Sequence, residues 1–264
     1  MISLAANGYA ELYELLDRGE VPIEFIKCPL SPDSQVDVDR ALSYRPVVLH
    51  CWGPPGYSAT QPVIPEPELL RDLAQKTGTP FVSVHLEYEP ERDGSMDADA
   101  LLARIREQVD LLRELAQKQI LLENVPFYPW QNKPRWGTDP ELITAAVEAS
   151  EAAFLLDLAH ARVAAWHRGD DIRDYLAALP LHKAREVHIS GPRMAEEGLR
   201  DRHMALTEED YDLLDWVMTK APMVEIVTVE YAGKRAKTAH YGEADGPDLL
   251  LQQLVKLDVW RRRL

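Results

Sequence analysis

The chain has 264 residues, 46% of them hydrophobic, and a formal net charge of −15 from 44 acidic and 29 basic residues. This length suits one large domain over residues 1–264, and the acidic balance gives no bulk attraction to nucleic acid or to an anionic membrane, so neither is expected as a partner. Two cysteines, a start without a secretory signal and the lack of any apolar run near ~18 residues predict a cytoplasmic protein with no disulfide framework.

Short apolar runs alternate with amphipathic segments along the chain. The runs, predicted as strands, are residues 2–6, 23–28, 46–51, 81–86, 120–125, 154–159, 186–190 and 225–231. Apolar residues at helical spacing predict helices over 9–19, 66–78, 97–118, 139–150, 171–180 and 206–222. This alternation predicts an α/β fold with a parallel sheet, and eight strands predict closure into a (β/α)₈ TIM barrel, with an open doubly wound sheet as the alternative. The proline-rich stretches 54–67 and 126–140 are predicted as long loops.

Six of the predicted strands end, or nearly end, on a histidine or an acid: His50, His85, Glu123, Asp157, His188 and Glu230. Active sites of TIM barrels form at the carboxyl ends of the strands, so these six side chains are expected to meet at one mouth. Side chains alternate along a strand, so the residue two positions earlier also points inward. Those residues are Val48, Ser83, Leu121, Leu155, Glu186 and Thr228. The mouth is therefore predicted to be polar above a mostly apolar or small interior.

The acids of this mouth, Glu123, Asp157 and Glu230, would repel one another at close range. A bound cation removes that repulsion. Imidazoles combined with carboxylates suit first-row transition metals, zinc and iron especially, whereas calcium and magnesium prefer oxygen ligands alone. The strand ends therefore predict a transition-metal site.

Two short motifs enlarge the predicted metal site. His160 follows Asp157 by three residues, at the first turn of a predicted loop, and Asp201 precedes His203 by two in the long segment after the seventh strand. The nine candidate ligands fall into three sets: His160, Asp201 and His203; His50, His85 and Glu123; and Asp157, His188 and Glu230. With Glu123 bridging, two or three metal ions are predicted, and Glu123, Asp157 and His188 are the predicted catalytic residues.

Each of these residues alone has a simpler interpretation. A strand-end histidine is commonly a hydrogen-bonded structural residue, Glu123 or Asp157 could cap a helix, and Asp201 and His203 could be ordinary surface residues of a charged loop. Three histidines at eight strand ends are far more than chance places there, so the set as a whole favours the metal site.

The remaining reactive residues carry weaker signals. His167, His182 and His240 fit no strand end and are predicted to be solvated or structural, and Cys28 and Cys51 to be small buried thiols. Aromatic and basic residues of the upper loops are candidates for substrate contact or, equally, for packing of loops against helices: Lys27, Trp52, Tyr57, Tyr88, Trp130, Trp136, Arg193 and Arg202.

The ligand series, with the stretches LLENVPFY, DLAH, VHISG and DRH, resembles the xylose-isomerase-like TIM barrel superfamily. From about residue 20 to 235, the chain is similar to bacterial multinuclear non-haem iron-dependent oxidative enzymes that modify ribosomally made peptides, the methanobactin-biosynthesis type. A second branch that it resembles is endonuclease IV-like, with the same ordered ligand types around a trinuclear zinc site.

The first resemblance implies an oxidoreductase in which iron is favoured, although zinc or manganese would also fit. Its substrate would be a small peptide or small molecule, and a partner protein could deliver the peptide. The second implies a zinc phosphodiesterase, which the acidic chain and the few basic residues between 123 and 161 disfavour. A sugar (phosphate) isomerase or epimerase and a non-enzymatic metal-binding module also stay open. Because a two-histidine, one-carboxylate centre leaves positions open for dioxygen and substrate, the iron-dependent oxidase is the preferred interpretation.

Overall fold

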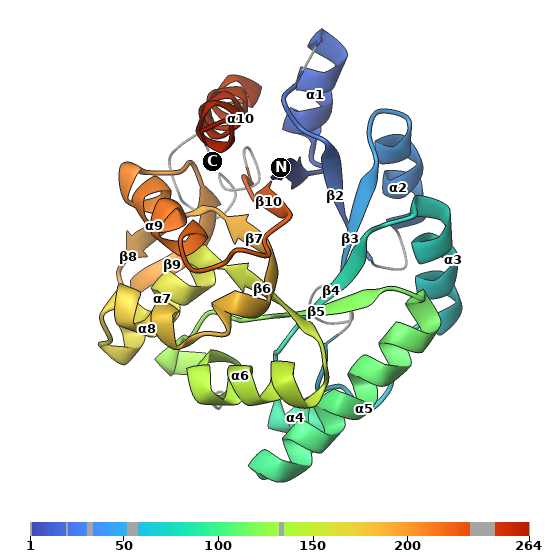
Figure 1. Ribbon diagram of the computed structural model, residues 1–264, viewed down its shortest axis with the longest axis vertical. Coiled ribbons are helices and arrows are strands. Elements are labelled where there is room, and N and C mark those ends of the chain that lie inside the picture. Colours follow the sequence, from blue (N-terminus) through green and yellow to red (C-terminus); the bar gives the residue numbers. More distant parts are fainter. Residues whose placement is uncertain are drawn as a thin grey trace.

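The computed structural model describes residues 2–19, 21–30, 34–51, 58–131, 135–232 and 246–263. Within these residues, eight parallel strands close into a barrel in the order β1-β10-β7-β6-β5-β4-β3-β2. Helices surround the barrel on the outside (Figure 1). The predicted TIM barrel is confirmed, and the closed sheet excludes the alternative of an open doubly wound sheet.

The eight barrel strands correspond to the eight predicted apolar runs. Their bounds are β1 (Ser3–Asn7), β2 (Phe25–Pro29), β3 (Val47–Cys51), β4 (Phe81–His85), β5 (Gln119–Glu123), β6 (Ala153–Asp157), β7 (Ala184–Ile189) and β10 (Ile226–Val229). Glu230 directly follows β10, and His50 is the residue before the end of β3. The polar strand ends therefore all lie at the carboxyl-terminal face of the barrel.

Ten α-helices lie within the described residues: α1 (Ala10–Arg18), α2 (Ser34–Leu42), α3 (Pro67–Thr77), α4 (Pro90–Asp93), α5 (Ala98–Ala116), α6 (Pro140–Ala149), α7 (Leu158–Arg168), α8 (Ile172–Ala178), α9 (Glu208–Met218) and α10 (Pro247–Arg261). The six predicted helices are found as α1, α3, α5, α6, α8 and α9. The predicted loop over 126–140 contains two short 3-10 helices, Pro129–Gln131 and Trp136–Thr138, and a third covers Leu181–Lys183. Residues 54–57 of the other predicted loop lie outside the described residues.

The boundary between β6 and α7 differs from the sequence prediction. The apolar run predicts one strand over 154–159, but β6 ends at Asp157 and α7 begins at Leu158. The Asp157 carboxylate accepts a hydrogen bond from the backbone N–H of His160 (2.7 Å), which caps the helix and stops the strand. His160 therefore lies in the first turn of a helix, not in a loop.

The segment after β7, predicted as a loop, forms an antiparallel hairpin of β8 (Gly191–Ala195) and β9 (Gly198–Met204). Its turn needs Gly198, which has φ +119° and whose added Cβ would lie 2.3 Å from the Trp166 ring. Asp201 and His203 therefore lie in a strand, and the prediction of a charged surface loop is wrong.

Two apolar clusters fill the molecule. One lies between the barrel and the helices, and the other fills the barrel interior with Ala5, Val48, Phe81, Leu121, Ala153, Leu155 and Ile226. Val48, Leu121 and Leu155 thus point inward, as the alternation predicts. Because these side chains close the lower barrel, the space available for ligands lies above them, at the mouth.

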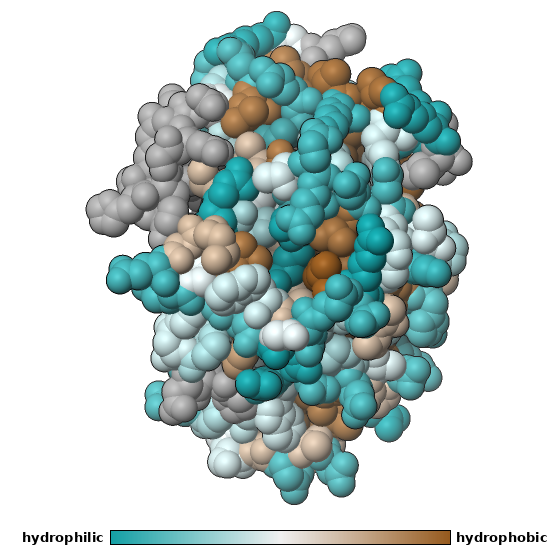
Figure 2. Space-filling model, turned by 90° about the vertical axis from the view of Figure 1, so that its left-hand side faces the viewer, coloured by the Kyte–Doolittle hydropathy of each residue, from teal (hydrophilic) through white to brown (hydrophobic). Residues whose placement is uncertain are grey.

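The face of the molecule that Figure 2 shows is largely polar. Figure 2 shows the side of the molecule that lies on the left in Figure 1, with hydrophilic residues over most of it and hydrophobic residues in small separate areas. Among the described residues, no helix is both long and apolar enough to cross a membrane.

Candidate metal centre

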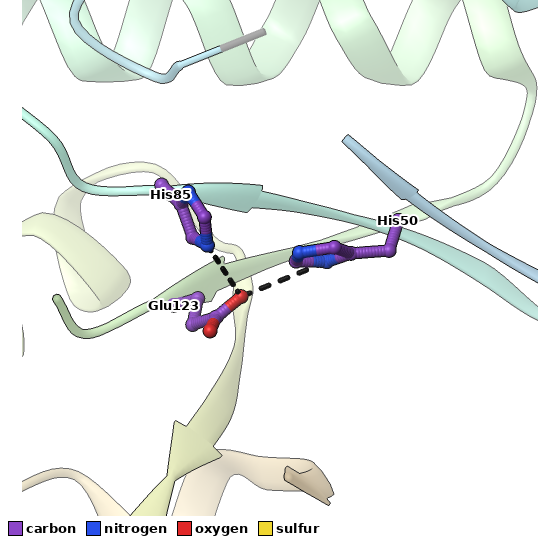
Figure 3. Close-up of side chains that lie close together, drawn as sticks. All are labelled: His50, His85 and Glu123. Carbon is purple, nitrogen blue, oxygen red and sulfur yellow. Dashed lines mark ion pairs between the residues drawn. The ribbon is translucent and has the colours of Figure 1, made fainter. Parts of the chain in front are cut away.

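The first group of candidate ligands comes from three adjacent strands, and we call it the strand set: His50 of β3, His85 of β4 and Glu123 of β5. The His85 Nε2 lies 3.3 Å and the His50 Nδ1 3.6 Å from the same Glu123 oxygen, Oε2. Figure 3 shows both imidazoles directed at that oxygen. The Ser83 hydroxyl shares a hydrogen bond with the His50 Nδ1 (2.8 Å) and so fixes the ring.

The second group, the hairpin set, consists of His160, Asp201 and His203. The Asp201 Oδ2 lies 2.7 Å from the His203 Nε2 and 3.4 Å from the His160 Nε2. The other ring nitrogen of His160, Nδ1, donates to the carbonyl oxygen of Asn124 (2.9 Å), which leaves Nε2 as the ligand nitrogen. A helix and a strand outside the barrel thus bring together residues that are 43 positions apart at the extremes, from 160 to 203.

The third group, the deep set, consists of Asp157, His188 and Glu230. Asp157 and His188 are register partners on β6 and β7, and the His188 Nδ1 lies 3.5 Å from the Glu230 Oε1. The His188 Nε2 donates to the buried carboxylate of Glu186 (3.2 Å), so Nδ1 is its ligand nitrogen. All nine predicted ligands therefore lie in three compact groups, within each of which the ligand atoms are no more than 4.8 Å apart.

Glu123 lies between the three sets. Its Oε2 faces the strand set, whereas its Oε1 lies 3.4 Å from the His160 Nδ1 and 3.7 Å from the His188 Nδ1. Glu123 is only 1% exposed, and within the described residues neither its Oε2 nor the His188 Nδ1 has a hydrogen-bond partner. Buried polar atoms normally have partners. A transition metal at the strand set would satisfy the Glu123 Oε2, and the mixed nitrogen and oxygen ligands fit iron, zinc or manganese.

The protonation of the strand set suits metal binding. Burial raises the pKa of Glu123, but His85 and His50 outweigh burial and hold this pKa well below its ordinary value. Burial, together with the charge of Lys27, lowers the pKa of His50 well below its ordinary value. The set therefore offers an ionised carboxylate and a neutral His50 imidazole, the forms that bind metals.

The other two sets favour protonated imidazoles, because carboxylates surround His203 and His188. Burial lowers the pKa of His203 and His188, but neighbouring carboxylates raise these values to about 9 and about 10. Burial raises the pKa of Asp157 to about 7. A metal ion entering these sets has to displace protons from them.

The strand-end pattern did not predict the contacts that two residues beside the ligands, Lys27 and Glu186, make with them. Lys27 of β2 is buried, and its ammonium contacts the Glu230 carboxylate. Glu186, which is 0% exposed, accepts hydrogen bonds from His188 and from the Thr228 hydroxyl (2.5 Å). The Glu-x-His spacing of 186 and 188 could have indicated this pairing, since the two residues share a face of β7.

The three sets border a cavity of about 350 Å³ at the barrel mouth. Its lining residues are Asn7, Tyr9, Lys27, Pro29, His50, His85, Glu123, His160, His203 and Glu230. Both the strand set and the hairpin set therefore reach the space in which a substrate would lie.

Among the residues predicted to contact substrate, only Lys27 lines this cavity within the described part of the chain. Tyr88 instead packs against Trp136 (5.5 Å between ring centroids) and donates its hydroxyl hydrogen to the Gly94 carbonyl. Trp130 stacks on Tyr128. Arg193 and Arg202 belong to the hairpin, and Trp52 and Tyr57 lie outside the described residues. Tyr88 and Trp136 therefore serve in packing of the loops, the second of the two roles expected for them.

Within the described part of the chain, the residues expected to be structural belong to none of the three ligand sets. The His167 Nε2 donates to the Leu199 carbonyl (2.8 Å) and so ties α7 to the hairpin. Cys28 and Cys51 are fully buried free thiols, as predicted. His240 lies outside the described residues.

The hairpin set is held by contacts outside the barrel. The Tyr128 hydroxyl accepts a hydrogen bond from the backbone N–H of Asp201 (3.0 Å), and the Arg200 guanidinium lies over the Tyr128 ring. His203 has φ +49°, a left-handed conformation uncommon for residues other than glycine. Such strained backbone clusters at functional sites, where surrounding contacts hold it in place.

Solved structures share this architecture. A xylose isomerase domain protein from Alicyclobacillus acidocaldarius is 21% identical, with a TM-score of 0.61 and coverage of 98% of this chain and 99% of that one. A D-tagatose 3-epimerase-like protein is 14% identical, with a TM-score of 0.64 and the same coverage. The fold is therefore the xylose-isomerase-like TIM barrel, and its mouth carries three candidate sets of metal ligands.

Family comparison makes the assignment more specific. The family model described as "RiPP precursor modification enzyme MbnB/TglH/ChrH" matches residues 33–238, and the chain belongs to this family. A UPF0276 protein of Acaryochloris marina is 26% identical over 142 residues, which are 51% of each protein. The match thus spans about half the length of this curated relative and of a second one, from Anaeromyxobacter.

Proposed function

We propose that this protein is an iron-dependent oxidase that modifies a peptide substrate at a multinuclear metal centre. The observation that carries the proposal is the match of residues 33–238 to a family of enzymes that modify ribosomally made precursor peptides. The ligand sets support it, since each of the strand and hairpin sets supplies two imidazoles and one carboxylate. This combination leaves coordination positions open on a six-coordinate metal.

The cavity supports a substrate bound directly at the ligands. Its volume of about 350 Å³ suits one or two amino-acid side chains, not a folded domain. His50, His85, His160 and His203 face this cavity from opposite ligand sets. A peptide side chain inserted there would touch both sets at once.

Bound iron would supply oxidation chemistry with dioxygen and electrostatic anchoring of a substrate thiolate or amide. The chain's own residues would orient these partners and move protons. Glu123 would hold two sets in register through its two oxygens. Asp157, with a pKa raised by burial to about 7, is placed to hold or release a proton at its Oδ2 near neutral pH.

The test is oxygen consumption by the anaerobically iron-loaded protein, supplied with synthetic peptides that contain a cysteine thiol or a side-chain amide. We expect dioxygen uptake and a mass change of the peptide with iron, and neither with zinc. His85→Ala, which removes one ligand of the strand set, should abolish both signals, whereas the exposed Glu68→Gln should leave them unchanged.

Two outcomes would contradict the oxidase. Cleavage of abasic DNA by the zinc form, without any need for oxygen, would support the phosphodiesterase instead. Interconversion of ketoses by the manganese form would support an isomerase or epimerase.

A further inference from the structure

Lys27 is a buried cation within the candidate metal centre. It lies on β2, where its register partners are Asn7 of β1 and Val48 of β3. Its side chain is 6% exposed, and its ammonium pairs with the Glu230 carboxylate at Oε1. A lysine is almost never buried to this extent without a charged partner.

The Glu230 oxygen that Lys27 contacts is the one that the deep set would use. Oε1 of Glu230 lies 3.5 Å from the His188 Nδ1, the ligand nitrogen of that residue. A metal ion bound between Glu230 and His188 would therefore share one carboxylate oxygen with the ammonium. Two cations in contact with one buried oxygen repel each other strongly, because the interior screens charge poorly.

We propose that the Lys27 ammonium takes the place of a metal ion at the deep set, so that the protein binds two metal ions, at the strand and hairpin sets, and no third. This inference rests on the proposed metal centre and sets its number of metal ions at two. It also assigns Lys27 a positioning role toward Glu230 in place of contact with substrate.

The other ligands of the deep set are also engaged elsewhere. Asp157 uses Oδ1 to cap α7 at the His160 N–H, and its backbone N–H donates to the Asn124 side chain (2.9 Å). The second oxygen of Glu230, Oε2, turns toward the hairpin set and lies 3.9 Å from the His203 Nε2. Glu230 thus joins Lys27 to the hairpin set without a metal ion between them.

The donor atoms for a third ion nevertheless remain in place. Within the described residues, the His188 Nδ1 has no hydrogen-bond partner. The Glu230 Oε1 would lose its contact with the ammonium if Lys27 were replaced by a neutral residue. We therefore expect a neutral residue at position 27 to allow one more metal ion to bind, which would not happen if Lys27 had a purely structural role.

The experiment counts metal ions in protein stripped by a chelator, reloaded anaerobically with iron(II) and desalted. We expect two ions per chain in the natural protein and three in Lys27→Met, which is similar in length but uncharged. The double variant Lys27→Met/Glu230→Gln should return to two, because it removes the carboxylate that would bind the third. The exposed Lys256→Met, whose ammonium pairs with Glu208, is the matched control and should keep two.

Thermal unfolding supplies a second readout that does not depend on activity. In chelator, Lys27→Met should melt below the natural protein, because Glu230 keeps a buried charge without a counter-ion. Iron(II) should raise its melting temperature more than it raises that of the natural protein.

Two results would overturn the inference while the proposed metal enzyme stands: three ions in the natural protein, or a folded Lys27→Met with an unchanged ion count. A natural protein that retains no ion would overturn the proposed metal enzyme and this inference together. Lys27→Gln provides the same neutral change if Lys27→Met does not fold.

Discussion

The strand set and the hairpin set use the same ligand types but are supported differently. His50, His85 and Glu123 stand on neighbouring strands of a closed barrel, where backbone hydrogen bonds fix each register. Asp201 and His203 stand on a two-stranded hairpin outside the barrel, which is not part of the closed sheet. One set is positioned by the barrel and the other by side-chain packing.

This difference decides how far each set depends on its surroundings. In the strand set, the Ser83 hydroxyl adds a contact to His50. The hairpin depends on Tyr128, on the His167 hydrogen bond to Leu199 and on the close approach of Gly198 to Trp166. The two sets therefore have the same ligand types, but we expect the hairpin set to be more sensitive to loss of its supporting contacts than the strand set.

Glu123→Gln should weaken metal binding at both the strand set and the hairpin set. Its Oε2 faces the strand set, and its Oε1 lies 3.4 Å from the His160 Nδ1, the nitrogen that orients this ring and does not bind metal, so its loss should disturb both sets. We expect the metal content to fall by more than one ion per chain, measured by elemental analysis after iron(II) loading. The exposed Glu68→Gln is the control. A loss of one ion or none would show that Glu123 does not bridge.

His203→Ala should empty the hairpin set alone. The side chain is 30% exposed, so we expect the loss of one ion with the barrel intact and the strand set still occupied. His203→Asn tests the same loss with less backbone strain, because asparagine tolerates a positive φ better than alanine. Full metal retention with a large fall in melting temperature would instead indicate a structural histidine.

Tyr128→Phe and Ser83→Ala each test one supporting contact, the first of the hairpin set and the second of the strand set. Each removes one hydroxyl that orients a ligand, and such changes typically weaken metal binding by about 10- to 100-fold. We expect Tyr128→Phe to weaken only the hairpin ion and Ser83→Ala only the strand ion. Competition with a chelator, measured in variants that keep one set each, would detect this; equal effects on both ions would contradict separate supports.

The pH dependence of metal affinity should also differ between the two sets, with the smallest effect of these tests. Despite burial, neighbouring carboxylates raise the pKa of His203 to about 9 and that of His160 well above its ordinary value, so below about pH 9 a metal ion must displace both protons and affinity should rise by more than about tenfold per pH unit. Burial lowers the pKa of His50, which therefore has no proton to displace in this range. Chelator titrations between pH 6 and 9, on His203→Asn and His85→Ala, would measure each slope; a steeper slope for the strand ion would contradict this assignment.

Much of the candidate site was predictable from strand ends alone. Parallel strands of a barrel all end at one face, so His50, His85, Glu123, Asp157 and His188 needed only the correct strand assignment to be placed together. The Asp-x-x-His and Asp-x-His spacings added the hairpin set. Helix α7 was missed because its first residues continue the apolar run of β6, and only the capping by Asp157 separates them.

The barrel and the ligand types could be predicted from the sequence, because the alternation of strands and helices and the residue at each strand end are local features of the chain. Three other features became visible in the folded chain: residues 191–204 form a hairpin, Tyr128 supports Asp201 across 73 positions, and Lys27 contacts Glu230 across 203 positions. Each depends on contacts between segments distant in sequence, and no local pattern specifies where a buried ammonium finds its carboxylate. The charge balance at the centre of the site is therefore a property of the closed barrel, since closure alone brings β2 and β10 to opposite sides of β1.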